Sequence, residues 1–352
     1  MKLVSVLIPA LHRPDLTQRC LASLARQSLP EQEMEILVME NEARPGSMLQ
    51  PPFAENVRCL NLDRNLGTTG SINLGLRQTR SQYVLLLNND VELEQRYLEV
   101  LVAALVADPK LGFATGKLLN ARRRGVLDGA GDALLRGGGA YRLGHDDPDQ
   151  GLFDRPVSVL AACGAAALFR RSLLEEVQGL DEDFFAYLDD MDLALRAQAA
   201  GYRGAYLPEA VAWHLGSATL GDSFHPRIAE LLTRNQLFLL WKNYPTGALL
   251  RLGGHILVFQ VLWLTLMLRR GMVLPYLRGV ADAFRQLPRM LAKRRWCLRR
   301  SRLSSREFLA LLCASEAQIY EWQAARPAAS RSALLARYFR FFRPCSRTGL
   351  NT

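Results

Sequence analysis

Apolar runs of strand length alternate with amphipathic stretches through the first hundred residues, and this alternation limits the possible folds more than any other feature. The apolar runs are residues 4–8, 34–39, 57–62 and 83–87. Helical periodicity follows in residues 15–27, 71–80 and 94–108. Because parallel strands need long crossover connections, usually helices, this order predicts an α/β domain with a mostly parallel central sheet flanked by helices.

Three of the apolar runs stop at short polar segments, which are Pro9-Ala10, Glu40-Asn41 and Asn88-Asn89-Asp90. Open α/β sheets bind ligands beyond the carboxyl ends of their strands, so we expect these segments to meet at one edge. Asp90 is the candidate ligand of a Mg²⁺ or Mn²⁺ ion that bridges two phosphates, with Asn88 as a neutral helper, because such cations prefer oxygen ligands. Turns are also rich in Asn and Asp, so a purely structural role is the alternative.

A second acidic group, Asp189-Asp190-Met191-Asp192, stands at the expected start of a helix. A helix N-terminus favours an ionised carboxylate, and a positioned carboxylate can accept the proton that an attacking hydroxyl loses. Asp190 is therefore the candidate general base, with N-capping as the alternative. His214 is either a further metal ligand or phosphate contact, or a satisfied structural histidine.

Two glycine-rich segments interrupt the alternation. Residues 64–75 lead into a helix and could bring backbone N–H groups close to a nucleotide, although they also fit a tight turn. Residues 122–154 are rich in Gly, Arg and Asp, and we expect them to form a flexible excursion near the site.

Basic residues are concentrated near the C-terminus. Residues 251–352 hold 19 Lys and Arg against 4 Asp and Glu, whereas residues 1–250 hold 25 against 30. The apolar stretch 256–268 is flanked by arginines and is shorter than the roughly 20 residues that a spanning helix needs. We expect it to lie in the interface of an anionic membrane, with a buried helix in a helical appendage as the alternative. No nucleic-acid-binding motif accompanies the charge, so nucleic acid is not expected as a partner.

The cysteines and the first residues bear on the compartment. The six cysteines are scattered without a C-x-x-C pair, so we expect reduced thiols rather than a disulfide framework or a zinc site. The chain enters a strand at Leu3 without the features of a secretory signal. These features predict a cytoplasmic protein associated peripherally with the inner face of the plasma membrane.

In their order and spacing, these motifs resemble the family 2 glycosyltransferases, especially the rhamnosyltransferase-like branch that builds bacterial cell-surface polysaccharides. The matching stretches are Val4–Pro9, Ile36–Asn41, Arg64–Gly67 with Asn73 and Gly75, Leu85–Val91, Cys163–Ala165 with Phe169–Arg171, Gly179–Asp192 with Arg196 and Gly201, and Trp213-His214. The resemblance implies a Rossmann-like GT-A fold for residues 1–245. The charge and the apolar stretch described above predict that a basic, helical, membrane-interfacial region follows over residues 246–352.

The same resemblance implies an inverting transfer of a single sugar, rhamnose or another hexose. The donor would be dTDP-rhamnose or a UDP-sugar, and the acceptor a glycan or a lipid-linked saccharide. Asp190 would be the catalytic base, and Asp90 and His214 would hold Mg²⁺ or Mn²⁺. The residues implied to contact the nucleotide sugar are Pro9, Ala10, Glu40, Asn41, Asn65, Asn73, Asn88, Asp189 and Arg196.

Three positions depart from the family pattern. Glu40 stands where the family usually has Asp, Asn88 replaces the first acid of the D-x-D motif, and Asp189 replaces the usual Glu. No Q-x-x-R-W motif follows His214, which argues against a processive synthase. The incomplete acidic motif and the basic C-terminal region leave one competing hypothesis: a non-catalytic, membrane-associated scaffold of a polysaccharide assembly complex that retains the fold.

Overall fold

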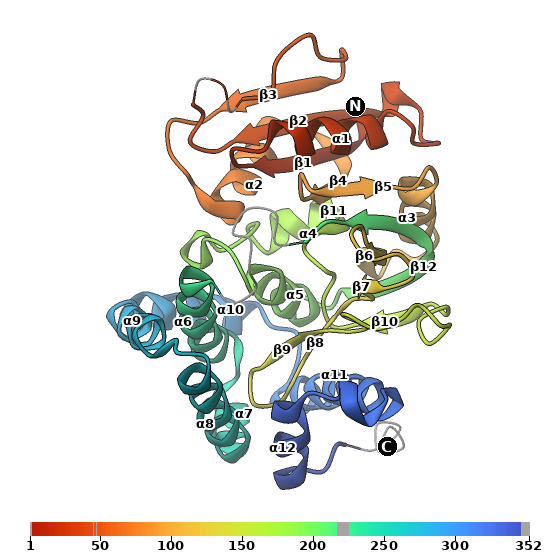
Figure 1. The fold of residues 1–352 in the computed structure, drawn as a ribbon. Coiled ribbons are helices and arrows are strands. Elements are labelled where there is room, and N and C mark those ends of the chain that lie inside the picture. The colour runs from red at the N-terminus through yellow and green to blue at the C-terminus, as the bar shows by residue number, and fades with distance from the viewer. Residues whose placement is uncertain (1, 45, 47, 217–224, 346–352) are drawn as a thin grey trace.

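The computed structural model describes residues 2–44, 46, 48–216 and 225–345, which fold around one large sheet with helices on both faces (Figure 1). The strands are β1 (Lys2–Ala10), β2 (Met34–Glu40), β3 (Val57–Asn61), β4 (Ser81–Leu87), β5 (Val91–Leu93), β6 (Leu111–Asn120), β7 (Leu127–Gly129), β8 (Asp132–Leu134), β9 (Ala140–Arg142), β10 (Val157–Val159), β11 (Ala166–Arg170) and β12 (Arg203–His214). The helices are α1 (Pro14–Leu24), η1 (Glu31–Glu33), α2 (Gly67–Gln78), α3 (Tyr97–Ala107), α4 (Arg171–Glu176), η2 (Glu182–Phe184), α5 (Asp189–Ala199), α6 (Pro226–Asn243), α7 (Thr246–Arg251), α8 (Gly253–Arg269), α9 (Val273–Arg285), α10 (Leu287–Arg300), α11 (Ser305–Ala325), η3 (Ala328–Ser330) and α12 (Ala333–Phe341).

The strand order of the sheet is β10-β12-β6-β11-β4-β1-β2-β3, with β5 paired to β12 and β7 to β6. Strands β4, β1, β2 and β3 run parallel to one another, as the sequence predicts. Strand β11 lies antiparallel between β4 and β6, which makes the complete sheet mixed. The predicted α/β fold with flanking helices is therefore confirmed.

The parallel strands are buried on both faces, which explains why they read as continuous apolar runs. In β1, Leu7 belongs to the core that also holds Ile72 of α2, whereas Val6 and Ile8 belong to the core that holds Cys20 of α1. Successive side chains of a strand point to opposite faces, so both sets must be apolar. This burial holds the carboxyl ends of β1, β2 and β4 at one edge of the sheet.

Residues 246–345 are helical and pack against the core of the preceding residues. Met290 of α10 and Phe308 and Leu312 of α11 share the core that Leu7 also lines. Figure 1 shows helices α6 to α12 gathered beneath the sheet. The predicted C-terminal helical region is confirmed, and no helix within the described ranges is long and apolar enough to cross a membrane.

The glycine-rich segment 122–154 is packed rather than flexible, so the prediction of a flexible excursion is wrong. Ala133 and Leu134 of its β8–β9 hairpin are fully buried. A Cβ atom on Gly137 would lie 2.6 Å from the carbonyl oxygen of His255 in α8, and one on Gly139 would overlap the ring of Phe259. The glycines are required because the hairpin turn lies directly against α8.

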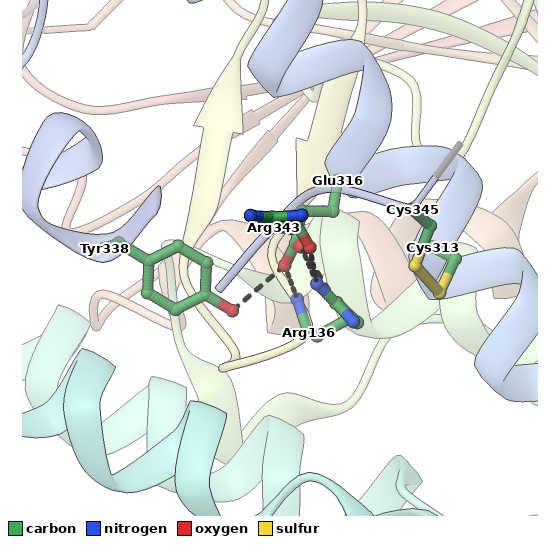
Figure 2. The surroundings of a disulfide bond; sticks show 6 residues. All are labelled: Arg136, Cys313, Glu316, Tyr338, Arg343 and Cys345. Atoms are coloured by element: carbon green, nitrogen blue, oxygen red, sulfur yellow. Dashed lines mark hydrogen bonds and ion pairs between the residues drawn. A yellow bond between two sulfur atoms is a disulfide. The ribbon is translucent and has the colours of Figure 1, made fainter. Parts of the chain in front are cut away.

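A buried ion pair fastens the hairpin to the C-terminal helices (Figure 2). Glu316 of α11 is fully buried and accepts hydrogen bonds from Arg136 Nε at 2.8 Å, from the Arg136 backbone N–H at 2.9 Å and from the Tyr338 hydroxyl at 2.9 Å. The Arg136 guanidinium also donates to the carbonyl oxygen of Arg343 at 2.8 Å. The hairpin is thus held in place by α11 and by the segment that follows α12.

We expect Glu316→Gln to lower the free energy of unfolding by about 1.5–3 kcal/mol, because the substitution removes charge-assisted hydrogen bonds to a nearly buried Arg136. Urea denaturation followed by circular dichroism measures the change. Glu55→Gln is the control, because Glu55 is an exposed residue before β3. Equal unfolding midpoints for the two variants would contradict this account.

Two of the six cysteines are not free thiols, so the expectation of reduced thiols throughout is wrong for them. Cys313 of α11 and Cys345 form a disulfide beside the Glu316 cluster (Figure 2). Cys20, Cys59, Cys163 and Cys297 are free. The pair is 32 residues apart in sequence and meets only because the segment after α12 returns to α11, which no local spacing reveals.

Candidate active site

The end of β12 and the turn after β4 bring Asp90 and His214 together. Asp90 lies in the turn from β4 to β5, and β5 pairs with β12 so that Val91 faces His214. His214 Nε2 lies 3.3 Å from Asp90 Oδ1, and the two side chains are only 8% and 9% exposed. The two residues predicted to hold a metal are therefore neighbours in a nearly buried position.

Asp128 of β7 contacts the other ring nitrogen of His214. The sequence did not point to Asp128 as a site residue. Asp128 Oδ2 lies 2.7 Å from His214 Nδ1 and 2.8 Å from Arg142 Nη1. Although burial opposes ionisation, Arg142 and His214 hold the pKa of Asp128 well below its usual range. An ionised carboxylate only accepts hydrogen bonds, so His214 Nδ1 carries a proton and Nε2 faces Asp90.

This donor set suits a hard divalent cation with few protein ligands. Burial lowers the pKa of His214, but the hydrogen bonds to Asp128 and Asp90 outweigh it and raise the pKa to about 9. A metal would take the place of the proton between Nε2 and Asp90. In the part of the chain that the structure describes, no group of three or more His, Cys, Asp or Glu side chains could hold a metal ion. A cation here would complete its shell with phosphate oxygens and water, as Mg²⁺ usually does.

Asp190 lies in the first turn of α5 and faces the loop before β11. Its Oδ1 accepts from the Met191 backbone N–H at 2.7 Å, and its Oδ2 accepts from the Gly164 backbone N–H at 3.3 Å. A Cβ atom on Gly164 would lie 3.1 Å from Asp190 Oδ2. Glycine at position 164 therefore lets the main chain approach this carboxylate closely.

The backbone before α5 is strained and firmly held. Phe185, Tyr187 and Leu188 have φ angles of 65°, 67° and 60°, which non-glycine residues rarely adopt. The side-chain amide of Asn235 in α6 donates to carbonyl oxygens of this loop, at 2.9 Å for Ala186 and 2.7 Å for Tyr187. Such strain persists only where the surroundings enforce it, and it collects at functional sites. The position of α5's first turn is thus fixed from outside the helix.

The three acids of this turn have different environments. Burial, and then the charge of Asp190, raise the pKa of Asp189, which favours its neutral form. Asp192 is fully buried and forms salt bridges with Arg196 and Lys242 at 2.8 Å each. Asp190 is partly exposed. Among these three acids, Asp190 is the one that is partly exposed, so it is the one that an acceptor hydroxyl could reach.

Residues of the β8–β9 hairpin link the two acidic groups, and the sequence did not point to them either. Arg142 Nε lies 3.6 Å from Asp132 Oδ1, while its Nη1 lies 2.8 Å from Asp128 Oδ2. Burial raises the pKa of Asp132; Arg142 opposes this rise, and the nearby charge of Asp190 adds to it. Asp190 and the pair Asp90–His214 therefore border the same buried cluster around Arg142.

Glu40 ends β2 beside Ala10, the last residue of β1. It is 5% exposed, and its Oε1 accepts from the backbone N–H of Leu49 at 2.7 Å. Its Oε2 is buried without a hydrogen-bond partner among the described residues. Burial also raises the pKa of Glu40 against the effect of the Leu49 N–H. An unpartnered buried oxygen at a strand end is a candidate contact for a ligand donor.

Asn41 and Asn65 shape the turn that leads into α2. Asn41 Oδ1 accepts from the Leu66 backbone N–H and from the Ser71 hydroxyl, both at 2.9 Å. Asn65 Oδ1 accepts from the Gly67 backbone N–H at 2.8 Å. These amides hold the glycine-rich turn beside the ends of β1 and β2. Pro9 and Asn88 also lie at this edge, at the ends of β1 and β4.

Asn73 and Arg196 are not brought to this edge. Asn73 makes two hydrogen bonds to the backbone of Leu180, at 2.8 and 2.9 Å. Arg196 is paired with Asp192 and donates to the carbonyl oxygens of Val177 and Gly179. Both side chains are occupied in holding the segment between α4 and η2, and both line a separate cavity. Their predicted contact with a nucleotide sugar stays a prediction.

Comparisons with known proteins agree with this arrangement. The sequence matches the family described as "Glycosyltransferase like family 2" over residues 2–233. The N-acetylglucosaminyl-diphospho-decaprenol L-rhamnosyltransferase of Mycobacterium tuberculosis is 29% identical over 282 residues, which cover 68% of this chain and 88% of that enzyme. The poly-beta-1,6-N-acetyl-D-glucosamine synthase of Staphylococcus epidermidis is 22% identical over 263 residues, which cover 73% of this chain and 60% of the synthase.

Among solved structures, the crystal structure of GalNAc-T7 with UDP, GalNAc and Mn²⁺ is similar, with a TM-score of 0.50 and 13% identity. The match covers 68% of this chain and 51% of that chain. At such identity the likeness concerns the fold alone. This chain therefore spans most of the mycobacterial enzyme but only about half of GalNAc-T7.

Proposed function

The chain belongs to the glycosyltransferase like family 2 and is a GT-A glycosyltransferase that uses a nucleotide sugar, and from this premise we propose that it transfers a single sugar with inversion. The observation that carries the proposal is one connected cluster of side chains: His214 contacts Asp90 and Asp128, Asp128 also contacts Arg142, and Asp190 lies near Arg142. Its relatives act in bacterial cell-surface polysaccharide synthesis. The 29% identity to a rhamnosyltransferase supports rhamnose, with another hexose as second choice, and supports a lipid-linked or glycan acceptor.

In the proposed reaction, an acceptor hydroxyl attacks the anomeric carbon of the donor. The new C–O bond forms as the bond to the diphosphate oxygen breaks, and the diphosphate leaves with the electron pair. Asp190 takes the proton of the acceptor hydroxyl. A divalent cation bound at Asp90 and His214 would neutralise charge on the leaving diphosphate. Glu40, through its unpartnered Oε2, would accept a hydrogen bond from the nucleoside.

Turnover of defined substrates tests this function. The full chain is incubated with Mn²⁺, N-acetylglucosaminyl-diphospho-prenol and dTDP-L-rhamnose, with UDP-glucose and UDP-N-acetylglucosamine as the other donors, and product mass is recorded. We expect one added sugar from one donor. The competing scaffold hypothesis instead predicts no turnover of any donor, together with absent or metal-independent nucleotide binding.

The positive charge and the exposed apolar side chains of residues 246–352 support membrane association of this region. Its proposed role is therefore separate from that of residues 1–245. In the stretch 256–268, α8 buries Phe259 but exposes Leu257 to 65%, so one part of the helix packs in the core and another leaves an apolar surface available to a membrane. On α9, Leu277 and Phe284 are 55% and 58% exposed. The next helix, α10, carries six of the 19 basic residues beyond position 250, and α8 and α9 carry three more. We therefore propose that α8 to α10 contact the anionic inner face of the plasma membrane.

We expect Phe284→Glu to weaken binding to vesicles of phosphatidylcholine with phosphatidylserine by about tenfold, because an apolar side chain no longer enters the interface. Flotation of the full chain with vesicles gives the bound fraction. Val106→Glu is the matched control, since Val106 of α3 is 62% exposed but lies in the first half of the chain. Equal binding to neutral and anionic vesicles, without dependence on salt, would contradict the electrostatic part of the proposal.

We expect Asp128→Asn to lower Mn²⁺ affinity by about 10–100-fold, because mutation of a carboxylate that orients a metal-bound histidine typically has that effect. The variant replaces the charged acceptor that keeps a proton on His214 Nδ1 with a neutral amide. Titration of Mn²⁺ in the presence of dTDP, followed by electron paramagnetic resonance, measures the affinity. Asp146→Asn is the control in the same segment, since the Asp146 side chain is 49% exposed. Unchanged affinity in Asp128→Asn would remove Asp128 from the site.

A further inference from the structure

A cavity of about 950 Å³ lies among α2, α4 and α10, away from the candidate active site. Arg171, the first residue of α4, is in its wall. The Arg171 guanidinium donates to the carbonyl oxygen of Ser81 at 2.7 Å, and Ser81 is the first residue of β4. Asp90 follows the opposite end of the same strand. The cavity therefore lies at the amino end of β4, and the candidate active site lies at its carboxyl end.

The wall of this cavity carries an excess of positive charge. Among the described residues, seven cationic side chains line it against three carboxylates. Four of the cations each form a salt bridge with an aspartate; they are Arg196, Lys242, Arg289 and Lys293. The excess is therefore concentrated on the remaining three arginines, on the side formed by α2 and α4.

These three arginines lack close carboxylate partners. Arg77 approaches Glu182 only to 3.9 Å. Arg80 donates to the carbonyl oxygen of Thr79 at 2.8 Å, and Arg171 donates to carbonyl and hydroxyl oxygens, so that neither has a salt bridge within the described ranges. Arg171 is only 9% exposed, and burial lowers its pKa. The charges of Glu175 and Glu35 oppose this effect, whereas the charge of Arg80 adds to it. A nearly buried cation without a carboxylate at salt-bridge distance is costly, so this end of the cavity favours an anionic ligand.

We propose that the cavity binds a phosphate group through Arg77, Arg80 and Arg171, at a site separate from the nucleotide. Guanidinium groups donate in pairs to phosphate oxygens, which makes arginine clusters selective for this anion. All three arginines line the cavity; Arg171 donates to the carbonyl oxygen of Leu76, the residue before Arg77, at 3.3 Å, and the charge of Arg80 is close enough to lower the pKa of Arg171.

The other residues of the cavity wall indicate which chemical group is attached to the bound phosphate. Apolar side chains, Leu174, Val177 and Leu180, continue the wall beyond the arginines, and Trp296 of α10 lines it as well. A volume of about 950 Å³ exceeds what a bare phosphate needs and approaches the upper range of small-molecule pockets. The phosphate group is therefore either free in solution or part of a lipid headgroup whose organic part meets these apolar side chains.

Binding of two probes to the full chain tests the proposal without any need for turnover. Inorganic pyrophosphate is titrated by calorimetry without metal, and vesicles with phosphatidic acid are compared with vesicles of equal phosphatidylserine content. Arg77→Gln/Arg80→Gln is the test variant, because both side chains are at the exposed end and the fold does not depend on them. Arg26→Gln/Arg155→Gln removes the same charge from exposed positions that do not line the cavity. Ala292→Trp, which narrows the cavity from α10, is the second test variant.

We expect the wild type and the Arg26→Gln/Arg155→Gln control to bind alike, and both test variants to bind at least about tenfold more weakly. Loss of pyrophosphate binding identifies free phosphate as the source, and loss of the preference for phosphatidic acid identifies a lipid headgroup. The proposal is overturned if the wild type binds neither probe, if the test variants bind like the wild type, or if dTDP with Mn²⁺ displaces the pyrophosphate. The last result would assign the phosphate to the donor site.

Discussion

Asp190→Asn is expected to lower kcat by about 10²–10⁴-fold, the range typical for loss of a general base. The amide has nearly the shape of the carboxylate, and its single oxygen can still accept from one of the two backbone N–H groups, those of Met191 and Gly164, so the fold and donor binding should persist. The effect should therefore appear in kcat while the KM for the donor changes little. Steady-state release of dTDP from dTDP-L-rhamnose in the presence of acceptor measures both.

Two further variants test whether the loss of activity is specific to Asp190. Glu209→Gln makes the same chemical change at an exposed position of β12 and should leave kcat unaltered. Asp189→Asn should lower kcat by at most about tenfold, because the buried Asp189 already favours the neutral acid that asparagine resembles. If Asp190→Asn keeps full activity, Asp190 is not the base. If Asp189→Asn is the more damaging change, the two neighbouring acids have exchanged roles.

The first half of the fold could be predicted from the sequence because its signals are local. The runs that form β1, β2 and β4 are apolar on both faces, and their polar ends mark one edge of the sheet. Asp90 and His214 were placed in one site from motif order, and the structure sets them 3.3 Å apart. Their contact is long-range, because it depends on the pairing of β5 with β12, and only the order of the motifs indicated it.

The part of the candidate site that the sequence did not predict depends on contacts between distant segments. The spacing of residues along the sequence does not reveal such contacts. Asp128, Asp132 and Arg142 lie in a glycine-rich segment whose composition indicated mobility, yet its glycines serve close packing against α8. Asn73 and Arg196 fit the motif order, but their hydrogen bonds hold the chain near Leu180 and Gly179. A pattern in one strand or helix cannot distinguish a side chain that binds a ligand from one that supports a loop.

Asp90→Ala is expected to lower kcat/KM by about 10²–10³-fold, because a cation that neutralises a leaving diphosphate contributes several kcal/mol to the transition state. The structure indicates that the neighbouring carboxylates would not substitute for the lost carboxylate of Asp90. Asp128 and Asp132, the nearest other acids of the cluster, are already engaged by Arg142, and Asp90 is the carboxylate that contacts His214 Nε2.

Rates measured over a Mn²⁺ titration should show that the wild type loses activity in EDTA, whereas the residual rate of Asp90→Ala no longer responds to metal. Glu92→Ala, two residues further on in β5, serves as the control for removing a carboxylate close to the site. A wild-type enzyme that remains fully active in EDTA would show that Asp90 and His214 meet for a reason other than holding a cation.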